Sequence, residues 1–340
     1  MSLEIGVQPT SRVVVVADII GDGDKQNIQQ RRDLEKSDSS TVEQLLATIA
    51  RLGLRGVHYQ TPEELAKQAK YHKQDLILSI YGGEVSRNRM ALVPAICETF
   101  ELNYIGPDTY GRVIAQDKEV SKRLAFDMGL ETPKWLIIRR IEDIQNIKSM
   151  SPPVVVKPSM EGSSIGISQS NLCHTLDEAI ILTMQLLSTF EQPILVEQFI
   201  AGKETALSVI ETNSGFECAY SEIWIPDDPD YFSNRLFDAE EKTNPSKEHT
   251  ARNIDHELST EQLDKIKTFL KAFGHFGYCR VDGKHIDGKF HFLEITPDAW
   301  IDKKGQFSMA FTEKGWTYDE VINAILLSAR KAPLNQLTND

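Results

Sequence analysis

The chain has 340 residues, enough for two or three domains with a substantial core, which excludes a small scaffold held together by disulfides. Its 50 acidic residues outnumber its 37 lysines and arginines, and the resulting charge of −13 gives nucleic acids and anionic membranes no general attraction. Hydrophobic residues make up 41% of the chain, as in an ordinary globular protein, and no apolar run approaches the roughly 20 residues that span a bilayer.

The start of the chain and its cysteines predict a cytoplasmic protein. Residues 1–11 lack the cationic and apolar segments of a secretory signal. The four cysteines lie far apart, without a C-x-x-C spacing or clustered histidines, so neither a zinc site nor a disulfide framework is expected. We interpret them as packing thiols in a reducing compartment: Cys97, Cys173, Cys218 and Cys279.

The first third of the chain predicts one α/β domain. Residues 12–19 form a β-branched run typical of the first strand of a buried parallel sheet. A capping-box spacing at residues 40–43 predicts an amphipathic helix that ends at Gly53, and a second box begins at Thr61. Strands are expected at residues 56–60 and 76–81. The polar residues 24–38 are interpreted as a solvated loop or surface helix rather than a substrate arm.

The middle of the chain predicts an α+β unit. A helix over residues 117–128 ends at Gly129, and a further helix opens with a capping box at Thr175. Four runs of strand-forming residues accompany these helices, at residues 134–138, 153–157, 164–168 and 194–198.

The last third predicts further strands near residues 205–210 and 217–225, then a capped helix over residues 259–273 and paired strands over 278–285 and 289–296. Between the two halves of this unit, residues 226–253 form a polar stretch that is too long for an ordinary connection. It is either a functional lid or a disordered insertion.

The most informative segment is VVVKPSMEGSSIG, residues 154–166. A buried strand delivers Lys157 at its end, and the small residues that follow could bring backbone N–H groups and the hydroxyls of Ser163 and Ser164 close to an anion. A Gly/Ser hairpin with a solvated lysine is an equally weighted alternative. The segment matches neither G-x-G-x-x-G nor G-x-x-x-x-G-K-[ST], so the two common phosphate-binding loops are excluded.

A second candidate is the buried strand over residues 194–200, which is followed by Gly202 and Glu204. Such a strand end could bind an adenine through backbone groups and a ribose through a carboxylate, although most glutamates at strand ends are only solvated.

A third candidate is the hairpin that carries Arg280, Asp282 and Glu294. A three-residue loop over residues 286–288 would place Arg280 opposite Glu294 and put all three side chains on one face. A two-residue loop over residues 287–288 would instead move Glu294 to the other face. Two carboxylates on one face near phosphates suit Mg²⁺, and a structural ion pair between arginine and carboxylate is the alternative.

In combination, these segments resemble the ATP-grasp ligases, and within them the D-alanine:D-alanine ligase-like group. The resemblance covers roughly residues 76–327 and is most specific at VVVKPSMEGSSIG, ILVEQFIAGKE and RVDGKHIDGKFHFLE. It implies an α/β and α+β fold with the three-domain ATP-grasp architecture. The implied parts are an N-terminal Rossmann-like (pre-ATP-grasp) domain over 1–115, a central lobe over 116–202, a C-terminal lobe with an ω-loop over 203–332, and a tail over 333–340.

The resemblance also assigns residues to roles. Arg280 resembles the arginine that stabilises an oxyanion, Lys242 the lysine of the mobile ω-loop, and Glu204 the ribose ligand. Catalytic roles are also expected for Ser163 and Ser164, which belong to the phosphate loop. The residues expected to bind ATP are Lys118, Lys157, Glu161, Gly162, Ser163, Ser164, Glu197, Phe199, Ile200, Glu204 and Lys242. Those expected to bind metal are Asp282, Glu294 and Asp298.

The implied activity is an ATP- and Mg²⁺-dependent ligation, with Mn²⁺ as an alternative metal, that forms an amide bond. A substrate carboxylate attacks the γ-phosphate of ATP, and an amine then captures the acyl phosphate. The implied partners are small, amino-acid-like carboxylate and amine substrates and a second copy of the chain, with no nucleic acid and no membrane.

Four departures from the family pattern concern the substrates and the metal. Thr296 stands where an asparagine usually binds metal, so Asp298 is the expected replacement ligand. Residues 21–24 lack the family's Ser-x-Glu element, residues 81–84 replace a His-Gly loop, and Thr243 replaces an aromatic residue. These changes favour a substrate pair other than two D-alanines. The alternatives are a true D-alanine:D-alanine ligase with a divergent N-terminal pocket and a nucleotide-binding protein with impaired turnover.

Overall fold

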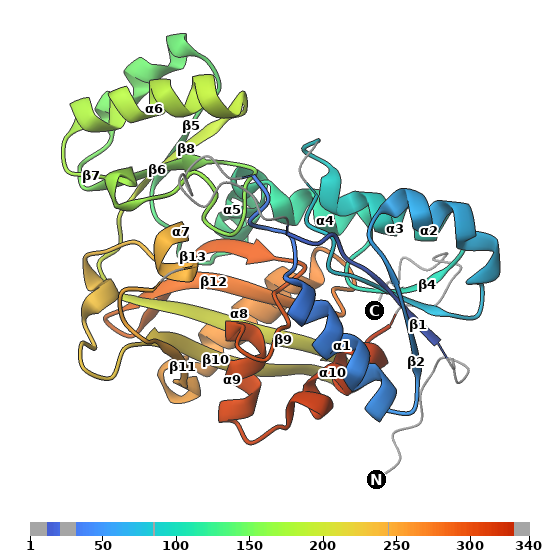
Figure 1. Ribbon diagram of the computed structural model, residues 1–340. Coiled ribbons are helices and arrows are strands. Elements are labelled where there is room, and N and C mark those ends of the chain that lie inside the picture. The colour runs from blue at the N-terminus through green and yellow to red at the C-terminus, as the bar shows by residue number, and fades with distance from the viewer. Residues whose placement is uncertain (1–11, 21–31, 84–85, 244, 330–340) are drawn as a thin grey trace.

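The computed structural model describes residues 12–20, 32–83, 86–243 and 245–329 (Figure 1). This part of the chain forms three β-sheets, and each draws its strands from one of the three predicted ranges. The domain boundaries themselves stay predictions. The predicted turn at residues 21–24, position 84 and the tail at 333–340 lie outside the described residues.

The N-terminal sheet is parallel, with the strand order β2-β1-β3-β4. Its strands are β1 (Arg12–Val16), β2 (Arg55–Tyr59), β3 (Leu76–Ser79) and β4 (Asn103–Ile105), and its helices are α1 (Ser39–Arg51), α2 (Pro62–Gln68) and α3 (Leu92–Thr99). Two short 3-10 helices, Ala69–Tyr71 and Arg89–Ala91, complete it. The capping box at Thr61 is confirmed. The one predicted at residues 40–43 is wrong, because α1 already begins at Ser39, with Asp38 at its N-cap and no side-chain cap.

The central sheet is antiparallel, with the order β5-β8-β6-β7. Its elements are β5 (Trp135–Ile138), the 3-10 helix Ile141–Ser149, β6 (Val154–Pro158), the 3-10 helix Gln169–Asn171, β7 (Leu172–Cys173), α6 (Leu176–Phe190) and β8 (Ile194–Gln198). The expected strand over residues 164–168 does not form. Ser164 and Gly166 have positive φ angles there, so the chain turns instead of extending.

The C-terminal sheet is antiparallel, with the order β11-β10-β9-β12-β13. Its strands are β9 (Lys203–Thr212), β10 (Gly215–Trp224), β11 (Thr250–Asn253), β12 (Tyr278–Ile286) and β13 (Lys289–Thr296). Between β10 and β11 the polar stretch contains the 3-10 helix Tyr231–Ser233 and α7 (Ala239–Thr243). The short 3-10 helix Asp255–Glu257, α8 (Thr260–Lys271), α9 (Gln306–Glu313) and α10 (Tyr318–Leu327) follow.

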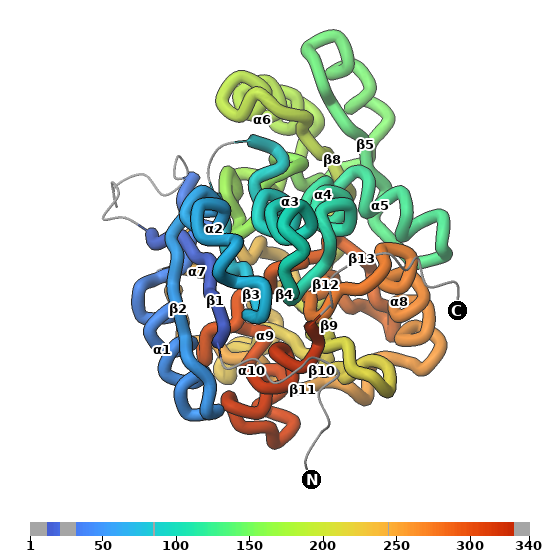
Figure 2. The backbone as a smooth tube through the Cα atoms, turned by 90° about the vertical axis from the view of Figure 1, so that its right-hand side faces the viewer, coloured from blue at the N-terminus to red at the C-terminus, as the bar shows by residue number. Residues whose placement is uncertain are grey.

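Two helices, α4 (Thr109–Gln116) and α5 (Lys118–Asp127), lead from the N-terminal sheet towards the central sheet. Although residue 116 is the predicted start of the central lobe, Ala125 in α5 shares a hydrophobic cluster with Phe269 and Phe292 of the C-terminal unit. The views in Figures 1 and 2 agree that α5 lies beside β13, beneath the central sheet. Helix α5 therefore lies between the two sheets.

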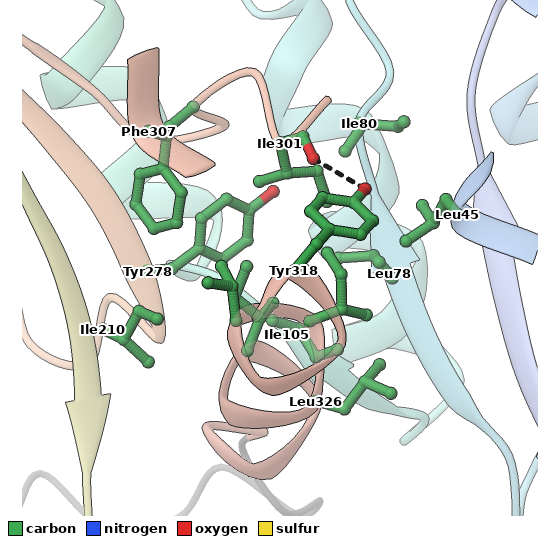
Figure 3. Close-up of a cluster of buried hydrophobic side chains, with 14 of the residues drawn as sticks. Leu45, Leu78, Ile80, Ile105, Ile210, Tyr278, Ile301, Phe307, Tyr318 and Leu326 are labelled. Atoms are coloured by element: carbon green, nitrogen blue, oxygen red, sulfur yellow. Dashed lines mark hydrogen bonds between the residues drawn. The ribbon is translucent and has the colours of Figure 1, made fainter. Parts of the chain in front are cut away.

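A further hydrophobic cluster joins the N-terminal sheet to the end of the chain (Figure 3). Leu45 of α1 and Leu78 of β3 pack in it with Phe307 of α9 and Leu326 of α10. The Tyr318 hydroxyl, at the start of α10, donates a hydrogen bond to the Ile301 carbonyl oxygen over 2.8 Å. The two ends of the described chain thus share one core.

This shared core generates a prediction. Leu45 is fully buried, so Leu45→Ala should remove apolar contacts and leave a cavity, lowering the free energy of unfolding by about 2–4 kcal/mol. Urea denaturation followed by fluorescence measures the change. Leu92→Ala is the matched control, because the Leu92 side chain is 40% exposed on α3 and its loss should cost far less. Equal losses at the two positions would contradict the shared core.

Candidate active site

Four of the predicted site residues come from α5, β6, β12 and β13, at the junction of the central and C-terminal sheets (Figure 1). Lys118 begins α5, where the Asp117 side chain caps the helix by accepting hydrogen bonds from the backbone N–H groups of residues 119 and 120. Lys157 lies near the end of β6, Asp282 on β12 and Glu294 on β13. The Lys118 backbone N–H donates to the Ser159 carbonyl over 3.1 Å, which ties α5 to the strand that carries Lys157.

Glu294 is the carboxylate on which these cations converge. The Lys118 ammonium lies 2.8 Å from its Oε2. Desolvation would raise the pKa of Glu294, but the charges of Lys118, Lys157 and Lys242 outweigh it and lower the pKa to about 2. Glu294 is therefore ionised throughout the neutral range. Its side chain is still 27% exposed, which leaves it open to a ligand.

A second carboxylate, Glu197 near the end of β8, is fully enclosed and is shared by two lysines. Lys157 Nζ lies 2.5 Å from its Oε1 and Lys122 Nζ lies 2.8 Å from its Oε2. Burial acts to raise the pKa of Glu197, but the two lysine charges lower it overall. Lys122 was not among the residues predicted from the sequence. Its spacing of four residues from Lys118 on one helix was the available signal, because residues four apart share a helix face.

The β12–β13 hairpin has a two-residue turn, and its two carboxylates still lie on the same face of the sheet. Asp287 and Gly288, both with positive φ, form a two-residue turn, which is the alternative that was expected to move Glu294 to the other face. The register then shifts between Asp282 and Gly283, leaving Leu293 as an extra residue in β13. Because of this bulge, Asp282 lies directly opposite Glu294. The two carboxylates therefore share a face despite the turn that was expected to separate them.

Arg280 lies on the same face of β12 and is held by Asp282. Its Nε and Nη2 donate to the two carboxylate oxygens of Asp282 over 2.5 and 3.0 Å. Thr296 lies opposite Arg280, and its hydroxyl donates to Asp282 Oδ2 over 2.9 Å. The guanidinium is thus fixed in a two-point contact, the geometry in which arginine is best oriented.

Asp298 does not join this group of carboxylates. It forms an ion pair with Arg112, a fully buried residue of α4. Burial raises the pKa of Asp298 to about 6, and Arg112 opposes that rise. The structure therefore gives Asp298 a different partner from the one expected of a metal ligand. Among the described residues no group of three or more histidine, cysteine or acidic side chains is placed to hold a metal ion.

Left-handed backbone shapes the predicted phosphate loop over residues 161–164 and the residues that follow it. Ser163, Ser164 and Gly166 have φ angles of 48°, 58° and 74°. A Cβ at Gly166 would lie 2.4 Å from the Phe190 ring, so only glycine fits at that position. Ser163 is exposed, whereas the buried Ser164 hydroxyl donates to the Phe237 carbonyl over 3.0 Å. The loop is thereby attached to the segment that carries Lys242.

The other side of the loop is held by the N-terminal domain through residues that were not predicted from the sequence. The Gly162 N–H donates to Glu35 Oε1 over 2.7 Å, and Arg89 bridges Glu35 at 2.5 Å and Glu161 at 3.0 Å. Burial and the nearby charge of Glu161 raise the pKa of Glu35, while Arg89 acts in the opposite direction. The Glu35 side chain is only 4% exposed, so the interpretation of residues 24–38 as a solvated segment is wrong at this residue. Nothing in the sequence of a polar stretch indicates that one of its carboxylates is buried.

The adenine- and ribose-binding candidates lie near one more lysine that was not predicted. Lys284 Nζ is 2.7 Å from Glu204 Oε2 and 5.8 Å from the centre of the Phe199 ring. The Phe199 N–H donates to the Pro153 carbonyl over 3.0 Å, so that amide already has a partner within the protein. Ile200 follows as a half-buried residue.

Lys242 faces the site from α7. Its ammonium lies 5.2 Å from the centre of the Phe237 ring, and its side chain is exposed. Desolvation by the surrounding protein and the charge of Arg280 lower the pKa of Lys242, while the charges of Glu294 and Asp282 oppose this. The four predicted cations therefore act on one pair of carboxylates.

Known proteins place this arrangement in a family. A family model described as "D-ala D-ala ligase C-terminus" matches residues 124–327. The chain belongs to the D-Ala-D-Ala ligase family. Curated relatives named D-alanine--D-alanine ligase include one from Pelagibacter ubique, 27% identical over 85% of this chain and 92% of the relative, and one from Thermotoga petrophila, 26% identical over 84% and 90%.

Solved structures show the same fold. A D-alanine--D-alanine ligase from Bacillus anthracis complexed with ATP gives a TM-score of 0.71 at 18% identity, covering 94% of this chain and 97% of that one. A D-Ala:D-Ser ligase from Enterococcus faecalis gives 0.66 at 18% identity, covering 94% and 99%. The predicted ATP-grasp architecture, ATP-dependent carbon–nitrogen ligase class and cofactors ATP and Mg²⁺ are confirmed for the family. No helix in the described ranges is long and apolar enough to cross a membrane.

The ion pair of Asp298 generates a prediction. Asp298→Asn should leave the buried Arg112 without its counterion and lower the free energy of unfolding by about 3 kcal/mol, as urea denaturation can measure. Asp228→Asn, which breaks a surface pair with Lys247, is the control and should change stability little. If Asp298→Asn instead raised the Mg²⁺ concentration needed for half-maximal ADP release, Asp298 would be a metal ligand after all.

Proposed function

We propose that the protein is an ATP- and Mg²⁺-dependent ligase that joins two amino acids through an amide bond, with D-alanine and D-alanine as the favoured pair. The observation that carries this proposal is the set of four cations, Lys118, Lys157, Lys242 and Arg280, around the facing carboxylates Asp282 and Glu294. The family and the curated relatives support the substrate pair. The structural neighbour named D-Ala:D-Ser ligase is 18% identical and shares the fold alone.

The residues present fit a nucleotide with its metal. Lysines neutralise phosphate charge, and two carboxylates on one face suit Mg²⁺, which usually takes one or two protein carboxylates together with phosphate oxygens. In this proposal Lys118, Lys157 and Lys242 hold the phosphates, and Asp282 and Glu294 hold the metal. When bound, ATP supplies the phosphoryl group that activates a substrate carboxylate as an acyl phosphate.

The loop and the ends of the nearby strands would complete the binding of ATP. We assign Glu161, Gly162, Ser163 and Ser164 to the phosphates. The Ser164 contact with Phe237 connects this loop to the segment of Lys242, so the two can move together and exclude water. Glu197 and the backbone of Phe199 and Ile200 are assigned to the adenine, and Glu204 to the ribose.

Arg280 is the proposed donor to the oxyanion that forms when the amine attacks. A preorganised donor of this kind is typically worth about 3 kcal/mol in the transition state. Its two hydrogen bonds to Asp282 fix the guanidinium before any substrate arrives. Asp282 would therefore serve both the metal and the orientation of Arg280.

The chemistry of the substrate side favours one second candidate, a ligase for another carboxylate and amine. Glu35 and Arg89 of the N-terminal domain hold the phosphate loop through Gly162 and Glu161, and Thr296 occupies the position facing Arg280. The third alternative, a nucleotide-binding protein with impaired turnover, rests on Thr296. The cytoplasmic location and the homodimer also remain predictions.

An amino-acid panel separates these candidates. The purified protein is incubated with ATP and Mg²⁺ and single or paired D- and L-amino acids, and release of ADP and phosphate is measured together with the product mass. D-alanine alone should give turnover and a dipeptide. Turnover with another pair only would replace the favoured pair by the second candidate. Nucleotide binding without turnover across the panel would support the third.

A substitution tests the role of Asp282. Asp282→Asn should reduce kcat at least a hundredfold, because it weakens both metal binding and the orientation of Arg280. The melting temperature of the Asp282→Asn variant should fall only slightly, so the loss of kcat is not explained by unfolding. Asp319→Asn is the matched control, since Asp319 makes a similar two-point contact with Arg51 on the surface. Unchanged kcat in Asp282→Asn would remove Asp282 from the site.

A further inference from the structure

We propose that Lys122 is a positioning residue for nucleotide binding, which acts through Glu197 to keep Lys157 available to the phosphates. This inference rests on the proposed function, because it assigns Lys157 to the phosphates of ATP. It adds a residue that does not itself contact the nucleotide. The physical basis is that two lysines share one carboxylate and that only one of the two can change partner.

The geometry of the three groups is unequal. Lys122 is fully buried in α5, with its ammonium 2.8 Å from Glu197 Oε2, 3.4 Å from the Phe292 carbonyl and 5.7 Å from the centre of the Trp135 ring. These contacts surround it on several sides. Lys157 binds the other oxygen of Glu197, but its side chain is 9% exposed. Lys122 is thus a fixed counterion, whereas Lys157 is at the edge of the buried region.

The charges of the three groups follow from this geometry. One carboxylate between two ammonium groups leaves a net positive charge, and the two lysines repel each other across Glu197. That repulsion cancels part of the attraction between Lys157 and Glu197. Burial lowers the pKa of Lys122, whereas the negative charges of Glu197 and Glu294 raise the pKa of Lys157 despite burial, so Lys157 stays charged. The excess positive charge is therefore on the lysine that can reach a phosphate.

Without Lys122, Glu197 and Lys157 would form a neutral one-to-one pair. Moving Lys157 to a phosphate would then leave Glu197 as a buried carboxylate with no counterion, which is costly. With Lys122 in place, Glu197 keeps a partner when Lys157 moves. The role of Lys122 is to lower the cost of that exchange.

The experiment measures ATP affinity directly by isothermal titration calorimetry, in the presence of Mg²⁺ and without amino acids. Lys122→Met should raise the Kd for ATP about tenfold, and Lys122→Gln, which keeps a polar group towards Glu197, should also raise it. In steady-state assays the KM for ATP should rise more than kcat falls. Lys67→Met, which removes an exposed lysine paired with Glu63 on α2, is the control and should leave the Kd unchanged.

A double-mutant cycle separates positioning from a general loss of stability. The Glu197→Gln substitution removes the negative charge that Lys122 neutralises. Adding Lys122→Met to this variant should therefore change the Kd for ATP by less than twofold. An effect of Lys122→Met that is as large in that background would overturn the inference. The inference would also be overturned if Lys122→Met and Lys122→Gln, each made alone, left the Kd for ATP unchanged. Failure of the unmodified protein to bind ATP would instead overturn the proposed function.

Discussion

The compensation of two carboxylates, Glu197 and Glu294, by lysines from three different segments is the interaction on which the site depends. A carboxylate that is largely removed from water is tolerated only when cations lie close to it. Lys118 and Lys122 come from α5, Lys157 from β6 and Lys242 from α7, so the charge balance requires α5 to lie between two sheets. The packing of Ala125 against the C-terminal core provides that placement. Hydrophobic contacts thus position the helix, and the ion pairs define what its first two turns can bind.

The β12–β13 hairpin shows how a local irregularity can decide which side chains meet. A two-residue turn fixes the pairing near the tip, and a single extra residue, Leu293, changes the pairing beyond it. Asp282 and Glu294 face each other only because of this residue. The bulge is therefore as much a part of the site as the carboxylates themselves, since its loss would turn Glu294 towards the opposite face of the sheet.

Much of the fold could be predicted from the sequence, because hydrophobic runs and capping boxes depend on neighbouring residues. The strands that carry Lys157, Glu197 and Asp282 and the box at Thr175 follow this rule. The strand expected over residues 164–168 does not form, because Ser163 and Ser164 have left-handed backbone. Serine also adopts extended conformations, so its presence in the sequence did not indicate this turn. Glu35, Arg89 and Lys122 could not be placed, since their burial results from contacts between distant segments. The partner of Asp298 was hidden for the same reason: Arg112 is 186 residues away in the chain.

The core shared by α1, β3, α9 and α10 has a consequence for how the protein is made. One face of the N-terminal sheet packs on Phe307, Val321 and Ile325, which leave the ribosome about 300 residues after β1. Until then only α1 covers that face, and the valines and leucines that α1 leaves exposed invite association with other chains. The N-terminal sheet, although it is made before the other two, is consequently among the last to complete its packing. A folding helper that protects β1 and β3 during synthesis would therefore have its greatest effect before α10 emerges.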